Sequence, residues 1–140
     1  MPLSLEERQD FLAEPHVAAL AVTAAGGRGP LNVPVWYAYE PGGEVQVMTE
    51  RGSRKAQLIR AAGRYSLLVQ QTEPTYRYVT VEGPVTAADP VTEEELRAIT
   101  ARYLPAERVE EYVTRVLPGI DELVNFRLRP EHWLSADVSA

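Results

Sequence analysis

The sequence predicts a single domain of mainly β (α+β) structure, an antiparallel β-barrel with short peripheral helices. The first observation behind this prediction is a series of about six or seven short runs rich in Val, Leu, Tyr and Thr, which are typical of strands. The second is their order, because most of these runs follow one another with only a turn between them. The third is the lack of a domain boundary, internal repeat or low-complexity tract, so we expect residues 1–140 to form one domain.

The strands are predicted from apolar runs and from alternation with a period of two residues. The predicted strand ranges are 17–22, 31–39, 45–49, 65–69, 76–87, 123–128 and 133–138. Turns containing Gly or Pro separate the first three, so we expect them to form a three-stranded meander. The pair Gly83-Pro84 inside the long fifth range predicts a bulge or bend.

The helices are predicted from their capping signals. Ser4 with Glu7, and Thr92 with Glu95, have the spacing of capping boxes. The helices are expected to begin at Ser4, Ser53, Thr92 and Pro105 and to end before Pro15 and near Ala62, Tyr103 and Leu117.

Composition excludes several functional classes. The net charge of −6 argues against a nucleic-acid binder, which needs a basic surface. The chain has no cysteine, so disulfides, thiolate metal sites and cysteine nucleophiles are excluded. Its two histidines, His16 and His132, are far apart, and we predict no metal site and no hydrolytic triad. With no signal peptide and no apolar run of membrane-spanning length, a cytoplasmic protein that does not interact with membranes is expected.

A window without acidic residues surrounds the predicted second helix. Residues 51–72 hold five of the fourteen basic residues, among them Lys55, the only lysine of the chain. Ser53 is a natural N-cap there, and Arg54 and Lys55 would occupy the first helical turn. Unpaired N–H groups and the positive end of the helix dipole make such a helix start a binding site for phosphate. The alternative is an ordinary N-cap with solvated basic side chains.

The alternation over residues 31–39 assigns its aromatic residues to two faces. Tyr37 and Tyr39 share the apolar face with Val33 and Val35, so we expect both tyrosines in the core. Trp36 falls on the opposite face, where a ligand contact and a core position are both open.

Four segments, in order, resemble the pyridoxamine 5′-phosphate oxidase-like superfamily of flavin and deazaflavin oxidoreductases. They are Gly29–Tyr37, Val45–Val69 with Met48-Thr49 and Ser53-Arg54-Lys55, Tyr76–Gly83, and Pro130–Trp133. The resemblance implies a split β-barrel of the FMN-binding type that forms a homodimer. It also implies a cofactor, F420 or FMN, from which a hydride passes to a small unsaturated substrate. Because that cofactor supplies the chemistry, the resemblance assigns no catalytic acid or base.

The resemblance also implies a set of cofactor-binding residues. Val33, Pro34, Val35 and Trp36 would line the ring, while Met48 and Thr49 would meet its pyrimidine end. Ser53, Arg54 and Lys55 would hold the phosphate. Tyr78 and Trp133 would contribute near the ring, from this subunit or from the second one.

The segment after Trp133 differs from that of the true pyridoxamine phosphate oxidases. Only Leu134–Ala140 follow, without the Arg/His-containing segment that holds the substrate in those enzymes. Pyridoxamine phosphate is therefore not the expected substrate, and F420 is the preferred cofactor, with FMN as the alternative. A non-enzymatic carrier of FMN, F420 or a tetrapyrrole is the alternative function.

Overall fold

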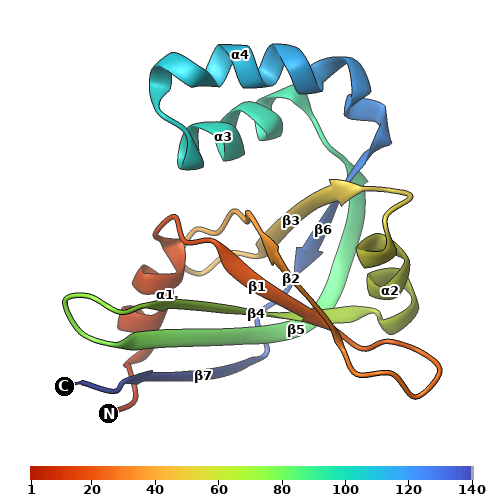
Figure 1. The fold of residues 1–140 in the computed structure, drawn as a ribbon. Helices are drawn as coiled ribbons and strands as arrows, with labels where there is room; N and C mark the ends of the chain where they lie inside the picture. The colour runs from red at the N-terminus through yellow and green to blue at the C-terminus, as the bar shows by residue number, and fades with distance from the viewer. Residues whose placement is uncertain (140) are drawn as a thin grey trace.

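The computed structural model describes residues 1–139 as an antiparallel, strongly curled sheet with four α-helices around it (Figure 1). The elements, in chain order, are α1 (Leu5–Ala13), β1 (Ala18–Val22), β2 (Leu31–Val35), β3 (Val45–Glu50), α2 (Arg54–Ala62), β4 (Arg64–Gln71), β5 (Arg77–Pro90), α3 (Glu93–Tyr103), α4 (Ala106–Val116), the 3-10 turn η1 (Leu117–Glu122), β6 (Leu123–Leu128) and β7 (His132–Asp137). The predicted antiparallel split-barrel fold is confirmed. No helix within residues 1–139 is long and apolar enough to cross a membrane.

The strands follow the order β2-β1-β4-β5-β6-β3, and β7 pairs with β5 beyond the end of β6. The two end strands of this order, β2 and β3, are joined only by an isolated bridge between Ala38 and Gln46. That bridge closes the curled sheet into a barrel at one point. Elsewhere β2 pairs only with β1, and β3 only with β6. The barrel therefore has a split between β2 and β3.

The predicted three-stranded meander is wrong in its third strand. Ala18–Val22 and Leu31–Val35 pair as expected, but Val45–Glu50 pairs with Leu123–Leu128, far away in the sequence. The strand predicted over residues 31–39 also ends at Val35. Pro34 has no N–H to donate to another strand, which suits an edge strand and favours the split over continued pairing.

The predicted bend at Gly83 is confirmed, and the structure gives its cause. β5 pairs with β7 up to Glu82, with β4 up to Pro84 and with β6 from Val85 onward, where the register shifts between Val85 and Ala87. A Cβ atom on Gly83 would lie 1.9 Å from the carbonyl oxygen of Arg129. Only glycine lets the β6–β7 connection approach the backbone of β5 this closely.

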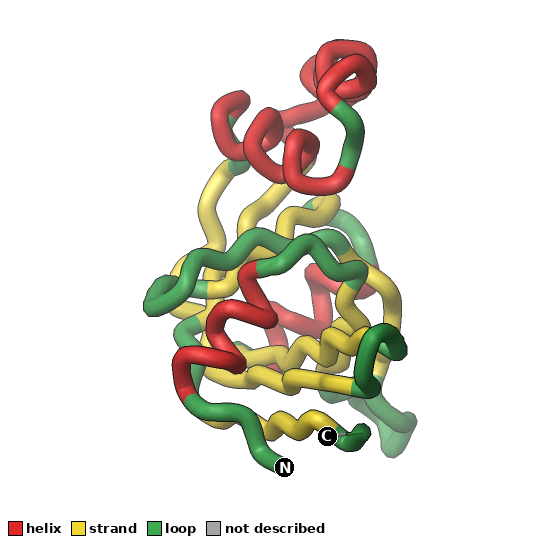
Figure 2. The backbone as a smooth tube through the Cα atoms, turned by 90° about the vertical axis from the view of Figure 1, so that its left-hand side faces the viewer, coloured by secondary structure: helices red, strands yellow, loops and turns green. Residues whose placement is uncertain are grey.

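Two apolar clusters stabilise the molecule. The larger one fills the barrel, where Tyr37 is completely buried and Tyr39 nearly so, as predicted. The smaller one lies under the α3–α4 hairpin around Leu96 and Val113. Figure 1 shows this hairpin at one end of the barrel, and Figure 2 shows both chain termini at the opposite end.

Both predicted capping boxes are present, and α3 is held to the barrel at each of its ends. At its start, Glu95 accepts hydrogen bonds from Arg127 and Asn125 of β6. At its end, the guanidinium of Arg102 donates to the backbone carbonyls of Ala13 and Glu14 at the C-terminal end of α1. The Tyr103 hydroxyl donates to the carbonyl of His16 at 2.7 Å. These contacts fix α3 across the end of the barrel.

Candidate functional site

The split between β2 and β3 brings together residues that are distant in the sequence. Val33–Val35 lie on the free strand β2, and Met48 and Thr49 lie on β3, which has the other free edge. Trp36, just after β2, and Met48 line one cavity of about 230 Å³. The residues predicted to meet the cofactor ring from two sides therefore come from the two strands that border the split.

The start of α2 completes this region, because α2 follows β3 after a tight turn. Ser53 is its N-cap, as predicted, and its Oγ accepts a hydrogen bond from the N–H of Ala56 at 3.1 Å. The same hydroxyl donates to the carbonyl of Glu50 at 2.8 Å and lies 3.4 Å from the Oγ1 of Thr49. Ser53 thus orients the helix start, while the first N–H groups, those of Arg54 and Lys55, have no intrahelical acceptor.

The positive charges of Arg54 and Lys55 are not neutralised by neighbouring side chains among the described residues. Within residues 1–139, neither side chain has an ion pair or a hydrogen bond. Arg54 lines a cavity of about 230 Å³ together with residues 28–32, which lead from the β1–β2 turn into β2. The helix start therefore faces the same strand that carries the predicted ring contacts.

Arg28 is a candidate that the sequence reasoning missed. It lines the same cavity as Arg54 and has no ion pair in the described part of the chain. Its position in the turn Gly26-Gly27-Arg28-Gly29 was visible, but nothing in the sequence pairs that turn with α2. Two guanidinium groups with no carboxylate partner within residues 1–139 favour an anion in this cavity.

The other basic residues of the acid-free window correct part of the sequence argument. Arg64 forms ion pairs with Glu82 and Glu131, at 3.0 and 2.9 Å. Arg51 and Arg60 donate to backbone carbonyls. A window without acids in the sequence is thus not free of acids in space, because β5 and the β6–β7 connection bring carboxylates to it. Of the five basic residues in the window, only Arg54 and Lys55 have no polar partner within residues 1–139.

Two of the residues of β2 that are predicted to line the ring are accessible. Val33 and Pro34 line a shallow cavity of about 290 Å³ with Asn32 and residues 17–19. Asn32 also lines the cavity of Arg28 and Arg54, so the two cavities adjoin along β2. Val35, by contrast, is buried and contributes to the core.

Trp36 packs against the helical hairpin. Its ring stacks on Tyr103 with centroids 4.8 Å apart and an interplanar angle of 8°. It also lies 5.7 Å from the ring of Tyr112. Trp36 is half-buried, and its position on the face opposite Tyr37 follows the predicted alternation.

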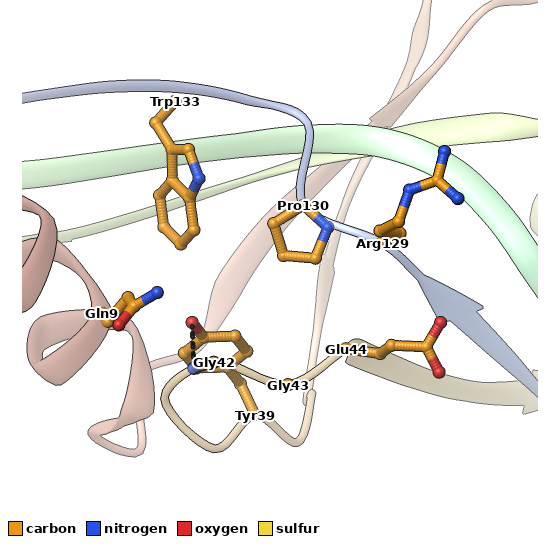
Figure 3. A pocket seen from close by; sticks show the side chains of 8 residues that line it. All are labelled: Gln9, Tyr39, Gly42, Gly43, Glu44, Arg129, Pro130 and Trp133. Carbon is orange, nitrogen blue, oxygen red and sulfur yellow. Dashed lines mark hydrogen bonds between the residues drawn. The ribbon is translucent and has the colours of Figure 1, made fainter.

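Within one chain, Trp133 and Tyr78 do not line the cavities to which Trp36, Val33 and Arg54 contribute. Trp133 lines a different cavity, of about 270 Å³, with Gln9, Tyr39, Glu44 and Arg129 among the side chains around it (Figure 3). Its ring makes an edge contact with Tyr39 at 6.4 Å, and the Arg8 guanidinium lies 4.9 Å from its centroid. Tyr78 projects from β5 between Gln70 and Ala136. Their predicted role near the ring therefore requires a second subunit.

The histidines do not form a metal site. The His16 Nε2 is 3.0 Å from the carbonyl of Phe11, and its ring packs on Phe11. His132 is exposed beside Glu131. No group of three or more His, Cys, Asp or Glu side chains suited to a metal ion occurs among the described residues.

The fold and the site define the class of protein. The sequence profile of the pyridoxamine 5′-phosphate oxidase family matches residues 4–131, and the chain belongs to this family. A search of the curated proteins found none that matches the chain.

Solved structures share the fold across nearly the whole chain. An F420 reductase is 22% identical with a TM-score of 0.72, and the match covers 90% of this chain and 94% of the other. A conserved hypothetical protein from Mycobacterium tuberculosis is 26% identical with a TM-score of 0.74, covering 96% and 85%. An FAD-binding protein from Mesorhizobium loti is 20% identical with a TM-score of 0.59, covering 96% and 93%.

Proposed function

We propose that this protein is a homodimeric oxidoreductase that binds F420, or alternatively FMN, in the split between β2 and β3. The observation that carries the proposal is the convergence of β2, β3 and the start of α2 beside two unpaired basic side chains. The family and the structural resemblance to an F420 reductase support it. The bound cofactor would supply hydride transfer, and the chain would hold, orient and shield it.

The groups at the start of α2 fit a phosphate monoester or diester. Arg54 offers a planar fork of donors, Lys55 a compact charge, and the helix start its free N–H groups. Thr49 and Ser53, whose hydroxyl oxygens are 3.4 Å apart, form the polar floor next to them. An ordinary helix start can also carry unpaired basic side chains, as Arg108 of α4 does within residues 1–139; at α2 two of them adjoin the free N–H groups, and Arg54 lines a cavity beside β2.

The preference for F420 rests on charge. F420 carries further carboxylates beyond its phosphate, and Arg28 provides a second guanidinium beside Arg54. FMN ends at its phosphate and leaves Arg28 without a partner.

The homodimer is supported by the outer face of the sheet. Pairing places one residue from each of five adjacent strands in a row on that face: Pro34, Ala19, Leu68, Thr80 and Leu134. Leu134 is 62% exposed and Leu68 36% exposed. A second copy on this face would cover the apolar row and bring its Tyr78 or Trp133 toward the split.

A non-enzymatic carrier of the same cofactors, or of a tetrapyrrole, is the alternative. It would use the same phosphate contacts but would need no free space beside the ring. The cavity that Trp36 and Met48 line favours an enzyme, because it offers such a space.

Titration of the apo-protein with F420 and FMN, side by side, tests the proposal. We expect both to bind, with F420 the tighter. Stoichiometric FMN that F420 does not displace would reverse the order of the two cofactors. If neither binds at micromolar concentration, the proposed function is wrong.

A further inference from the structure

We propose that the cavity beneath the α3–α4 hairpin is the substrate pocket, and that it takes a neutral or cationic, largely apolar molecule of roughly one or two rings. This inference rests on the proposed function, because it places the substrate beside the cofactor. It adds the chemical class of the substrate and a residue, Glu50, that selects for it.

The walls of the pocket come from both sides of the split and from the hairpin. Trp36 and Met48, the predicted ring contacts, form one side. The remaining lining residues are Glu50, Leu96, Ile99, Tyr112, Val116 and Leu123. A molecule in this cavity would touch the residues predicted to meet the ring and would be covered by α3 and α4.

The volume limits the size of the occupant. The cavity measures about 230 Å³. An apolar cavity of about 150 Å³ holds benzene, whereas pockets for drug-sized ligands begin near 300 Å³. A substrate of one or two rings fits between these limits, and a tetrapyrrole does not.

The charge of the residues that line the cavity limits the charge of the molecule that can bind there. Glu50 is the only charged residue among the eight that line the cavity, and its carboxylate has no ion pair or hydrogen bond within residues 1–139. The aromatic rings of Trp36 and Tyr112 also favour a cation, although the Arg115 guanidinium already covers one face of Tyr112 at 5.3 Å. An anionic substrate would be repelled by Glu50. With the cofactor bound, it would also be repelled by the phosphate at Ser53, three residues further along the chain.

Three matched probes test this assignment by calorimetry: naphthylmethylamine, naphthylmethanol and naphthoate. For the wild type we expect the amine to bind tightest and naphthoate weakest, with and without bound cofactor. Glu50→Gln should weaken the amine about two- to fivefold and leave the alcohol unchanged, because an exposed charge contributes modestly. Val116→Phe should weaken all three about tenfold or more by filling the pocket.

Thr114→Phe is the matched control, since Thr114 is exposed on α4 and does not line the pocket. It should bind the probes like the wild type, and all variants should bind the cofactor equally. If Val116→Phe leaves the affinity for the probes unchanged, or if the cofactor displaces the probes, the cavity is not the substrate pocket. Either outcome would leave the proposed cofactor site intact. Probes that bind to a protein that binds neither F420 nor FMN would overturn the proposed function and this assignment with it.

Discussion

Lys55 is the residue whose removal tests the phosphate site most directly. Lys55→Ala should weaken cofactor binding by about ten- to a hundredfold, because it removes a charge-assisted hydrogen bond contributing about 1.5–3 kcal/mol. Fluorescence titration at low salt measures this change. Added salt should weaken the wild type more than the variant, since the screened charge is the one that the variant lacks.

Arg108→Ala is the control for this substitution. Arg108 also lies in the first turn of a helix, α4, and is exposed without an ion pair in the described chain. Its removal changes the net charge equally and should leave cofactor affinity unchanged. Equal affinity of wild type and Lys55→Ala would remove the phosphate site from the proposal.

Gly83 carries a prediction for stability. Gly83→Ala should lower the free energy of unfolding by about 1–3 kcal/mol or more, because the new Cβ would meet backbone atoms of Arg129 and Glu131, which have little room to move. Denaturant unfolding measures the loss. Gly119→Ala is the control, since a Cβ there meets no atom within 4 Å, and it should change stability little. Similar values for the two variants would contradict the steric explanation.

At the scale of elements, the attachment of α3 to β6 depends on the Glu95 carboxylate. Burial raises the pKa of Glu95, but hydrogen bonds from the Thr92 N–H, Arg127 and Asn125 lower it by more. The pKa of Glu95 therefore lies below its ordinary value. Glu95 therefore stabilises the fold above the ordinary carboxyl pKa, and this contribution is lost as the pH falls through the lowered pKa of the folded state.

Glu95→Gln should lower the free energy of unfolding at neutral pH by about 1.5–3 kcal/mol. The difference from the wild type should shrink in acid, as the pH falls below the ordinary carboxyl pKa and through the lowered pKa of Glu95 in the folded state. Urea unfolding at both pH values measures it. Glu93→Gln removes an exposed pair with Arg97 in the same helical turn and should cost less than about 1 kcal/mol. A loss that is the same at both pH values would show that the charge is not responsible.

The elements that the sequence predicted well are those with local causes. Capping boxes at Ser4 and Thr92 and the β1–β2 hairpin depend on neighbouring residues, and all are present. The partner of β3 was missed because its pairing with β6 joins residues more than seventy positions apart, from Val45 with Leu128 to Glu50 with Leu123. Alternation identifies a strand and its inner face but does not identify its neighbour.

The residues of the candidate site also fall into those with local causes, which the sequence could indicate, and those brought together only by the fold. Ser53, Arg54 and Lys55 were predictable because one helix start carries all three. Arg28 and Tyr112 were not, since a turn and a helix far away in the sequence bring them to the split and to the pocket beneath the hairpin. The basic window was overestimated for the same reason, because Glu82 reaches Arg64 through strand pairing.

At the scale of the whole molecule, the second copy is expected to complete the site. The wild type should have twice the 15.6 kDa mass of the chain in light scattering with cofactor present. Leu134→Arg should yield the monomer mass, because an arginine in place of the most exposed leucine of this row would be buried without a partner in the dimer. Leu5→Arg is the control, since Leu5 is 55% exposed on α1 and is not part of this row, and it should remain dimeric. The monomeric variant should also lose cofactor affinity, because Tyr78 or Trp133 of the second subunit would no longer contact the ring. A wild type of monomer mass that binds the cofactor fully would contradict both the dimer and the shared site.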